Sequence, residues 1–407
     1  MEQLIILGNG FDLACELKSK YEHFYKSRYK DYYTSDIKAC YDFFNGSFIA
    51  SNRLDEVSEK PFLKINVWDF IFFIYEDVMQ NTWTDIEQTI RKHLEGLYYA
   101  CLYRSEDYSG WSRDMDEDFI NNTKSWYEYY KPVVELMCCR LKEQVYSFSE
   151  DKLNEQEELK TRWSAYKKQI LKELNDFEGH FVDYLNGATN FLIYQKSVNR
   201  LFSEIIRRYD ENGTSQHAPL NGLTTNVLSF NYTEVETFDK QKKIPLNEYR
   251  NVHGKLSRAR DGIIFGIDLQ ELKKNDVDKD FNSQDLFLEF TKTFRTLQMA
   301  SKFGTNKLYS KETKQIKFYG HGLGEADYSY FMSIFDAVEL YSGETRLVFF
   351  YNPELLNEEE KQFRRVSDLI LKYAETLKSE NHGDNLLHKL ILENRIKILP
   401  LKFTPSK

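Results

Sequence analysis

The opening residues Leu4-Ile5-Ile6-Leu7-Gly8-Asn9-Gly10 decide the fold class. A continuous run of four apolar residues is typical of a strand that is buried on both faces of a parallel sheet. Gly-x-Gly follows directly, and residues 11–25 can then run as a helix. Strand, Gly-x-Gly and helix together are the opening of a nucleotide-binding α/β unit. We therefore expect an α/β protein with a Rossmann-like parallel sheet.

Further short apolar runs return only after residue 222, and most of them precede a polar or glycine-containing turn. They lie at residues 227–230, 249–252, 262–265, 316–319, 347–351 and 396–401. Ligands of open α/β sheets bind just beyond the carboxyl ends of the strands. The turns after these runs are therefore where binding and catalytic residues are expected.

The stretch between the two strand-like regions has a helical pattern. Only two prolines, Pro61 and Pro132, occur between residues 29 and 217, and the apolar residues there recur at spacings of three and four. We expect a sheet core formed by residues 1–28 and 222–407, split by a helical insertion over residues 29–221. The insertion carries no catalytic motif, which suggests restraint of the core, homo-oligomerisation or recognition of a partner protein.

Composition excludes several functional classes. The 407 residues carry a net charge of −9, which argues against a general affinity for nucleic acid or for an anionic membrane. No apolar stretch is long enough to span a membrane, and no basic segment with a long apolar run opens the chain, so we expect a cytoplasmic protein. The five cysteines include no C-x-x-C pair, and no metal site is expected.

The first candidate site follows the first strand. Gly8 and Gly10 permit a tight turn and a close approach to a phosphate, and Asn9, Phe11 and Asp12 complete the candidate cofactor-binding turn. Leu13 stands where G-x-G-x-x-G has its third glycine, and no acidic residue marks the end of a second strand. These departures argue against an ordinary dehydrogenase, and a plain turn is equally open.

The second candidate site combines two turns. Asn231 and Thr233 follow one apolar run, and His253 and Gly254 follow the next. An asparagine amide can orient a ribose or a water, and a histidine can exchange a proton near neutral pH. Asn231 and His253 are the candidate catalytic residues, although a turn-forming asparagine and a structural histidine are the alternative reading.

The third candidate site is a glycine-rich loop that reads YGHGLGEAD at residues 319–327. Three glycines in five residues indicate a loop that is pressed against a ligand or another backbone. Gly322 occupies the nucleophile position of a G-x-S-x-G elbow, which excludes a serine hydrolase of that type. Gly320, His321 and Asp327 are the candidate nucleotide-binding residues of this loop, and a purely structural turn is the alternative.

Taken in order, these motifs resemble the AbiH family of bacteriophage abortive-infection proteins. The resemblance is carried by LGNGFD at residues 7–12, YEHF at 21–24, FNYT at 230–233, VHG at 252–254 and YGHGLGEADYSYF at 319–331. It runs through most of the chain, and the helical insertion is matched more by length than by sequence. The resemblance implies a role in stopping phage multiplication. It also implies a phage protein as the trigger or partner that the helical insertion would recognise.

The same skeleton resembles a wider group, the sirtuin-like NAD-binding proteins of phage defence. That resemblance implies that Gly8 and Gly10 hold the diphosphate, that Asn231 lies at the nicotinamide ribose and that His253 is catalytic. It also implies that Gly320 and Asp327 help to hold the nucleotide. Thr233 stands where the wider group has aspartate. The Cys₄ zinc module of the protein-deacylating sirtuins has no counterpart in this sequence, so deacylation is not expected.

The leading functional hypothesis is therefore hydrolysis of NAD⁺ at the bond between nicotinamide and ribose, which would deplete NAD⁺ in infected cells. Two alternatives stay open. The first is a non-catalytic sensor that binds NAD⁺ or a related ADP-ribose nucleotide, and Thr233 in place of aspartate is its best support. The second is an ADP-ribosyltransferase. In each case NAD⁺ is a substrate or ligand.

Overall fold

The structure is a computed structural model in which the chain divides into two compact units. We call them the sheet unit, residues 1–19, 185–258 and 296–407, and the helical unit, residues 20–184 and 259–295. The described residues are 2–46, 64–76, 86–103, 117–141, 155–188, 191–207, 223–233, 246–256, 262–267, 286–299, 307–324, 327–377 and 383–405.

A six-stranded sheet forms the centre of the sheet unit, and all of its paired strands are parallel. Its strands are β1 (Glu2–Leu7), β2 (Thr224–Ser229), β3 (Leu246–Asn251), β4 (Thr313–Tyr319), β5 (Arg346–Tyr351) and β6 (Ile396–Pro400). Their order is β3-β2-β1-β4-β5-β6, which is the Rossmann order. The predicted α/β class with a parallel Rossmann-like sheet is confirmed. The order reverses between β1 and β4, so a ligand crevice is expected beyond the ends of these two strands.

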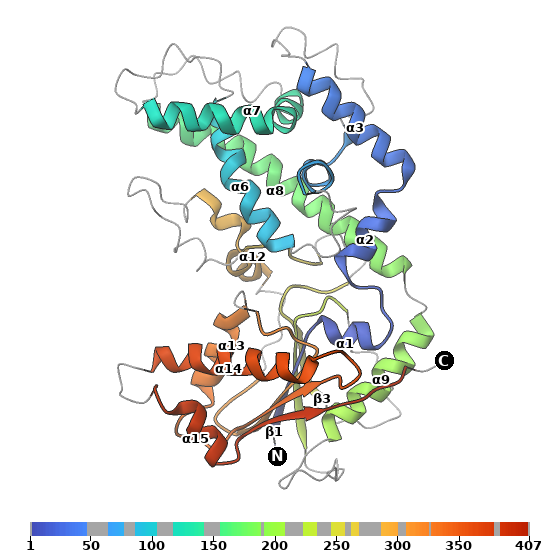
Figure 1. Ribbon diagram of the computed structural model, residues 1–407, viewed down its shortest axis with the longest axis vertical. Helices are drawn as coiled ribbons and strands as arrows, with labels where there is room; N and C mark the ends of the chain where they lie inside the picture. The colour runs from blue at the N-terminus through green and yellow to red at the C-terminus, as the bar shows by residue number, and fades with distance from the viewer. Residues whose placement is uncertain are drawn as a thin grey trace. The chain divides into compact units, whose positions relative to one another are not determined.

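Helices cover both faces of the sheet (Figure 1). Alternate residues of β1 point to opposite faces: Leu4 and Ile6 belong to one hydrophobic core, and Ile5 and Leu7 to the other. The first core includes side chains of α13 (Tyr328–Ala337), α14 (Glu358–Thr376) and α15 (Leu386–Leu392). The second includes side chains of α1 (Asn9–Ala14) and α9 (Phe191–Arg207). Burial on both faces explains why β1 is apolar throughout.

A buried lysine ties α9 to the sheet. Lys317 lies in β4 with no exposed surface, and its Nζ donates hydrogen bonds to the carbonyl oxygens of Ile205 (3.0 Å) and Ile206 (2.7 Å). These carbonyls belong to the last turn of α9, whose carbonyls lack partners within the helix. Burial lowers the pKa of Lys317 to about 7.

The helical unit is built almost entirely from helices, as the sequence predicts for most of this region. Its elements are α2 (Tyr21–Arg28), α3 (Asp31–Gly46), α5 (Val67–Phe70), the π-helix η3 (Ile71–Tyr75), α6 (Ile86–Tyr103), α7 (Glu117–Arg140), α8 (Glu155–Gly187), the 3-10 helix η6 (Leu288–Phe290) and α12 (Lys292–Met299). Aromatic rings fill its interior. Phe24, for example, contacts Phe177 and Phe181, with ring centroids 5.5 and 5.1 Å apart.

The division into units differs from the expected domain boundaries. Residues 191–207, expected in the insertion, form α9 and pack on the sheet, whereas residues 259–295, expected in the core, belong to the helical unit. The strand predicted at residues 262–265 is wrong, since only isolated bridges occur there. The Phe265 N–H donates to Glu178 at 2.6 Å and its carbonyl accepts from Arg295, so these backbone groups bond to side chains instead of a neighbouring strand.

The single helix predicted over residues 11–25 is also wrong. Helix α1 ends at Ala14, and α2 begins at Tyr21. Glu16 adopts a positive φ of 66°, and the N–H of Leu17 donates to the carbonyl of Asp12 at 3.0 Å. A left-handed residue followed by such a bond terminates a helix.

Candidate functional site

The candidate site residues gather at one edge of the sheet. Because the strands are parallel, their carboxyl ends lie together. Four turns meet there: Gly8 begins the turn after β1, Phe230 the turn after β2, Val252 the turn after β3 and Gly320 the turn after β4. All twelve predicted site residues lie in these turns or in the helices that follow them.

The glycines of the β1 and β4 turns interlock. The N–H of Gly8 donates to the carbonyl of Tyr319 at 3.0 Å, and the N–H of Gly10 donates to the carbonyl of Gly320 at 2.8 Å. A Cβ at Gly8 would lie 2.5 Å from His321 Cα, and a Cβ at Gly10 would lie 2.7 Å from Gly320 Cα. Close backbone contact therefore explains these glycines, and both N–H groups have partners within the protein. Their predicted contact with a diphosphate stays a prediction.

Asn9 and Phe11 of the same turn have local partners. Asn9 is exposed, and its side-chain oxygen accepts a hydrogen bond from the Ser19 hydroxyl. Phe11 is fully buried and packs edge-on against Tyr319, with ring centroids 6.1 Å apart. Phe11 thus belongs to the hydrophobic core beneath the turn.

Asp12 is the centre of a buried hydrogen-bond network. Its carboxylate accepts hydrogen bonds from the hydroxyl of Tyr194 at 2.7 Å and from the hydroxyl of Thr233 at 3.0 Å. Burial raises the pKa of Asp12 to about 7, although Tyr194, Thr233 and Asn231 each act to lower it. Asp12 can therefore gain or lose a proton near neutral pH. Sequence reasoning missed Tyr194, because α9 carries no local signal that it would meet Asp12.

The Asn231 amide is close to this network but is not part of a normal hydrogen bond. Asn231 is 3% exposed, and among the described residues neither its Oδ1 nor its Nδ2 has a partner of normal geometry. Its backbone is held by Asn251, whose amide donates to the carbonyls of Asn231 (2.7 Å) and Thr233 (2.9 Å). Asn251 opens the sequence motif that contains His253, but it was not among the predicted site residues.

His253 and His321 flank the carboxylate of Asp327. The Nε2 of His253 lies 3.5 Å from Asp327 Oδ1, and the Nε2 of His321 lies 3.4 Å from Asp327 Oδ2. The Nδ1 of His321 accepts a hydrogen bond from the N–H of Leu323 at 2.9 Å, so Nε2 is the nitrogen that carries its proton toward Asp327. Gly254, with a φ of +84°, makes the turn that follows His253.

One aromatic ring packs against both histidines. The centroid of Phe230 lies 4.5 Å from that of His321 and 5.6 Å from that of His253, and Tyr330 lies 5.6 Å away on α13. Phe230 and Tyr330 were not predicted as site residues. Their rings reduce the access of water to the imidazoles, which strengthens the electrostatic effect of Asp327.

No group of three or more His, Cys, Asp or Glu side chains in the described parts of the chain is arranged to hold a metal ion. Likewise, none of the helices within the described ranges combines the length and the apolarity that crossing a membrane requires.

Comparison with known proteins identifies the family. The family model described as "Bacteriophage abortive infection AbiH" matches residues 4–351. The chain belongs to the AbiH family. No curated protein and no solved structure matches the chain.

The family match covers the sheet edge described above. The match begins within β1 and ends at the last residue of β5, so it includes the four turns and every predicted site residue. The predicted resemblance to AbiH is confirmed, and with it a role in phage abortive infection. The wider sirtuin-like grouping stays a prediction.

Proposed function

We propose that the protein hydrolyses NAD⁺ at the bond between nicotinamide and ribose, and that this reaction is how it acts in abortive infection. The observation that carries the proposal is the buried Asn231 amide, whose two polar atoms have no hydrogen bond of normal geometry in the described part of the chain. An unsatisfied buried polar group costs about 1–3 kcal/mol, so a ligand at this position is favoured. A ribose hydroxyl or a water can supply both a donor and an acceptor.

The proposed reaction needs little acid catalysis. The bond between ribose C1′ and the pyridinium nitrogen breaks, and nicotinamide leaves as a neutral molecule with the bonding electron pair. Water adds to C1′ and loses a proton, so the products are nicotinamide, ADP-ribose and one proton. The protein has to orient the ribose, stabilise positive charge on it and accept the proton.

The residues at the sheet edge fit these three tasks. Asn231 would orient the ribose or the attacking water. Asp327 lies at Nε2 of His253, so Nδ1 is the nitrogen assigned to the proton of the water, and the carboxylate would stabilise the imidazolium that forms. The network of Asp12 supports the turn that carries Asn231, because Thr233 of that turn bonds to Asp12.

A non-catalytic sensor of NAD⁺ or of an ADP-ribose nucleotide is the second candidate function. The observation that favours it is Thr233, whose hydroxyl donates to both oxygens of Asp12 at 3.0 Å. That hydroxyl is committed within the protein and is not offered to a ribose. A sensor would bind the nucleotide at the same edge and release no nicotinamide.

The test is nicotinamide release from NAD⁺ by the purified full-length protein, alone and with extract of phage-infected cells. The site variants are Asn231→Ala and His253→Ala. The matched controls are Asn385→Ala, at the residue that precedes α15, and His388→Ala, within α15; both positions are exposed. We expect the wild type and the α15 variants to release nicotinamide and the other two to lose at least about 99% of the rate. Binding of NAD⁺ without release would favour the sensor. Label transferred to a macromolecule would indicate ADP-ribosylation, and neither binding nor release would refute the proposal.

A further inference from the structure

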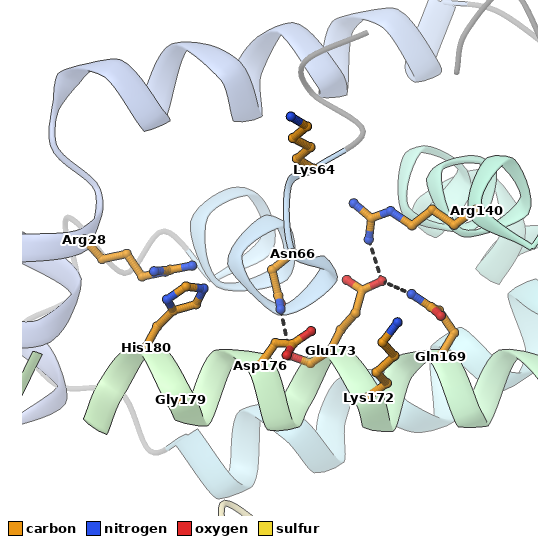
Figure 2. A pocket seen from close by; sticks show the side chains of 10 residues that line it. All are labelled: Arg28, Lys64, Asn66, Arg140, Gln169, Lys172, Glu173, Asp176, Gly179 and His180. Atoms are coloured by element: carbon orange, nitrogen blue, oxygen red, sulfur yellow. Dashed lines mark hydrogen bonds and ion pairs between the residues drawn. The ribbon is translucent and has the colours of Figure 1, made fainter. Parts of the chain in front are cut away.

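The helical unit contains a cavity of about 310 Å³ that the proposed reaction does not use (Figure 2). Ten residues line it: Arg28, Lys64, Asn66, Arg140, Gln169, Lys172, Glu173, Asp176, Gly179 and His180. All of them belong to the helical unit. The volume is near the lower end of the range that small-molecule sites occupy.

One polar face of α8 forms the floor of the cavity. Gln169, Lys172, Glu173, Asp176 and His180 recur at spacings of three and four residues, which places them on a single face of the helix. Gly179 adds no side chain to this face, which leaves space there. Aromatic residues of α8 point instead into the core of the unit. The polar face is therefore a distinct surface of the helix.

Two arginines from other helices face this floor, and each is fixed by a carboxylate. Arg28, the last residue of α2, bonds to Asp69 with an Nη2–Oδ2 distance of 2.5 Å. Arg140, the last residue of α7, bonds to Glu173 with an Nη1–Oε1 distance of 2.5 Å. Figure 2 shows Arg28 beside His180 and Arg140 beside Glu173. Guanidinium groups held in this way lose little freedom when a ligand binds.

The cavity carries an excess of positive charge. Asp69 offsets Arg28, and Glu173 offsets Arg140. Lys172 rises from the floor of the cavity and Lys64 lies on its rim, and neither forms an ion pair with a carboxylate in the described ranges. Asp176 is the remaining carboxylate among the lining residues, so the cations outnumber the anions even when His180 is neutral.

We propose that this cavity binds a small phosphate-bearing ligand, up to the size of a mononucleotide. Arginine and lysine are the side chains that proteins use to bind phosphate oxygens. Asp176 supplies an acceptor for a hydroxyl or amine on the same ligand. A structural ion-pair network alone accounts for Arg28 and Arg140, but it accounts neither for the cavity nor for the lysine on its floor.

The test is titration calorimetry of the full-length protein at constant ionic strength, with inorganic phosphate, AMP and succinate as separate probes. We expect AMP or phosphate to bind and succinate not to bind. Tighter binding of AMP than of inorganic phosphate would show that the ligand of the cavity is a nucleotide. Equal binding of the two probes would show that the ligand is free phosphate. Lys172→Gln should weaken binding about tenfold, which is the effect of losing one charged hydrogen bond. Lys168→Gln, at an exposed position of α8 outside the cavity, should bind as the wild type does.

Three results would overturn the inference. The first is absence of phosphate and AMP binding by the folded wild type, and the second is equal binding by the wild type and Lys172→Gln. The third is an equal affinity for succinate, which would refute the assignment to phosphate. His253→Ala should keep phosphate binding, and Lys172→Gln should keep nicotinamide release. The failure of one site is therefore distinguishable from the failure of the other.

Discussion

His253 and His321 share one carboxylate: the Nε2 atoms of the two imidazoles lie 3.5 and 3.4 Å from the two oxygens of Asp327. His253 follows β3 and His321 follows β4, so Asp327 connects two turns that are not adjacent in the sheet. In the proposed mechanism, this carboxylate orients His253 and stabilises its protonated form, which makes Asp327 a positioning residue.

Replacement of Asp327 by asparagine should reduce nicotinamide release without unfolding the protein. The amide has nearly the same shape as the carboxylate but carries no charge, so the imidazolium of His253 loses its stabilising partner. We expect kcat to fall about 100-fold, the size of effect that misplacement of a catalytic group produces. An unchanged rate would show that Asp327 does not act through His253.

Replacement of Gly320 by alanine should destabilise the sheet unit. Gly320 has a φ of +68°, and a Cβ there would lie 2.6 Å from the carbonyl carbon of Gly10. We expect a loss of about 2 kcal/mol or more in the free energy of unfolding, measured by urea denaturation. Gly322→Ala is the matched control, because no atom lies within 4 Å of a Cβ at that position. Equal unfolding free energies of Gly320→Ala and Gly322→Ala would show that the turns after β1 and β4 do not pack as closely as described.

The stability of the protein should depend on pH through Asp12. Burial raises the pKa of this carboxyl from 3.8 to about 7, so between these values the folded protein holds a proton that the unfolded chain has lost. Folding then takes up a proton, and the contribution of Asp12 to stability declines as pH rises through this window. Above pH 7 the full penalty of the buried charge is present.

Asp12→Asn removes this titration and isolates its effect. Relative to the variant, the wild type should lose about 2 kcal/mol of unfolding free energy between pH 5 and pH 7, as urea denaturation at the two pH values would measure. Tyr194→Phe, which removes one hydrogen bond to Asp12, should keep the sign of the pH dependence. A difference between wild type and Asp12→Asn that stays constant with pH would show that Asp12 is charged throughout.

The sequence predicts the sheet and the location of the site because both depend on local patterns. A strand buried on both faces must be apolar along its length, as β1 is at Leu4 to Leu7, and the turn after it needs residues such as Gly8. These rules do not require knowledge of distant residues. The edge at which the turns meet follows from the parallel topology, because the carboxyl ends of parallel strands lie together.

The errors arise where distant residues decide the structure. The apolar run at residues 262–265 resembles a strand, but Glu178 and Arg295 bond to its backbone, and within the described ranges it forms only isolated bridges. The contact of Asp12 with Tyr194 depends on where α9 packs. The joint contact of Asp327 with both histidines likewise depends on tertiary structure, although all three residues were recognised as candidates.

The most direct test of the account is the concentration of NAD⁺ in cells that produce the wild type or His253→Ala, with and without phage. His388→Ala, an exposed histidine outside the site, is the control. The account predicts that NAD⁺ collapses after infection in cells with the wild type or His388→Ala and is retained in cells with His253→Ala, at equal protein levels. Protection from phage by the wild type with unchanged NAD⁺ would contradict it.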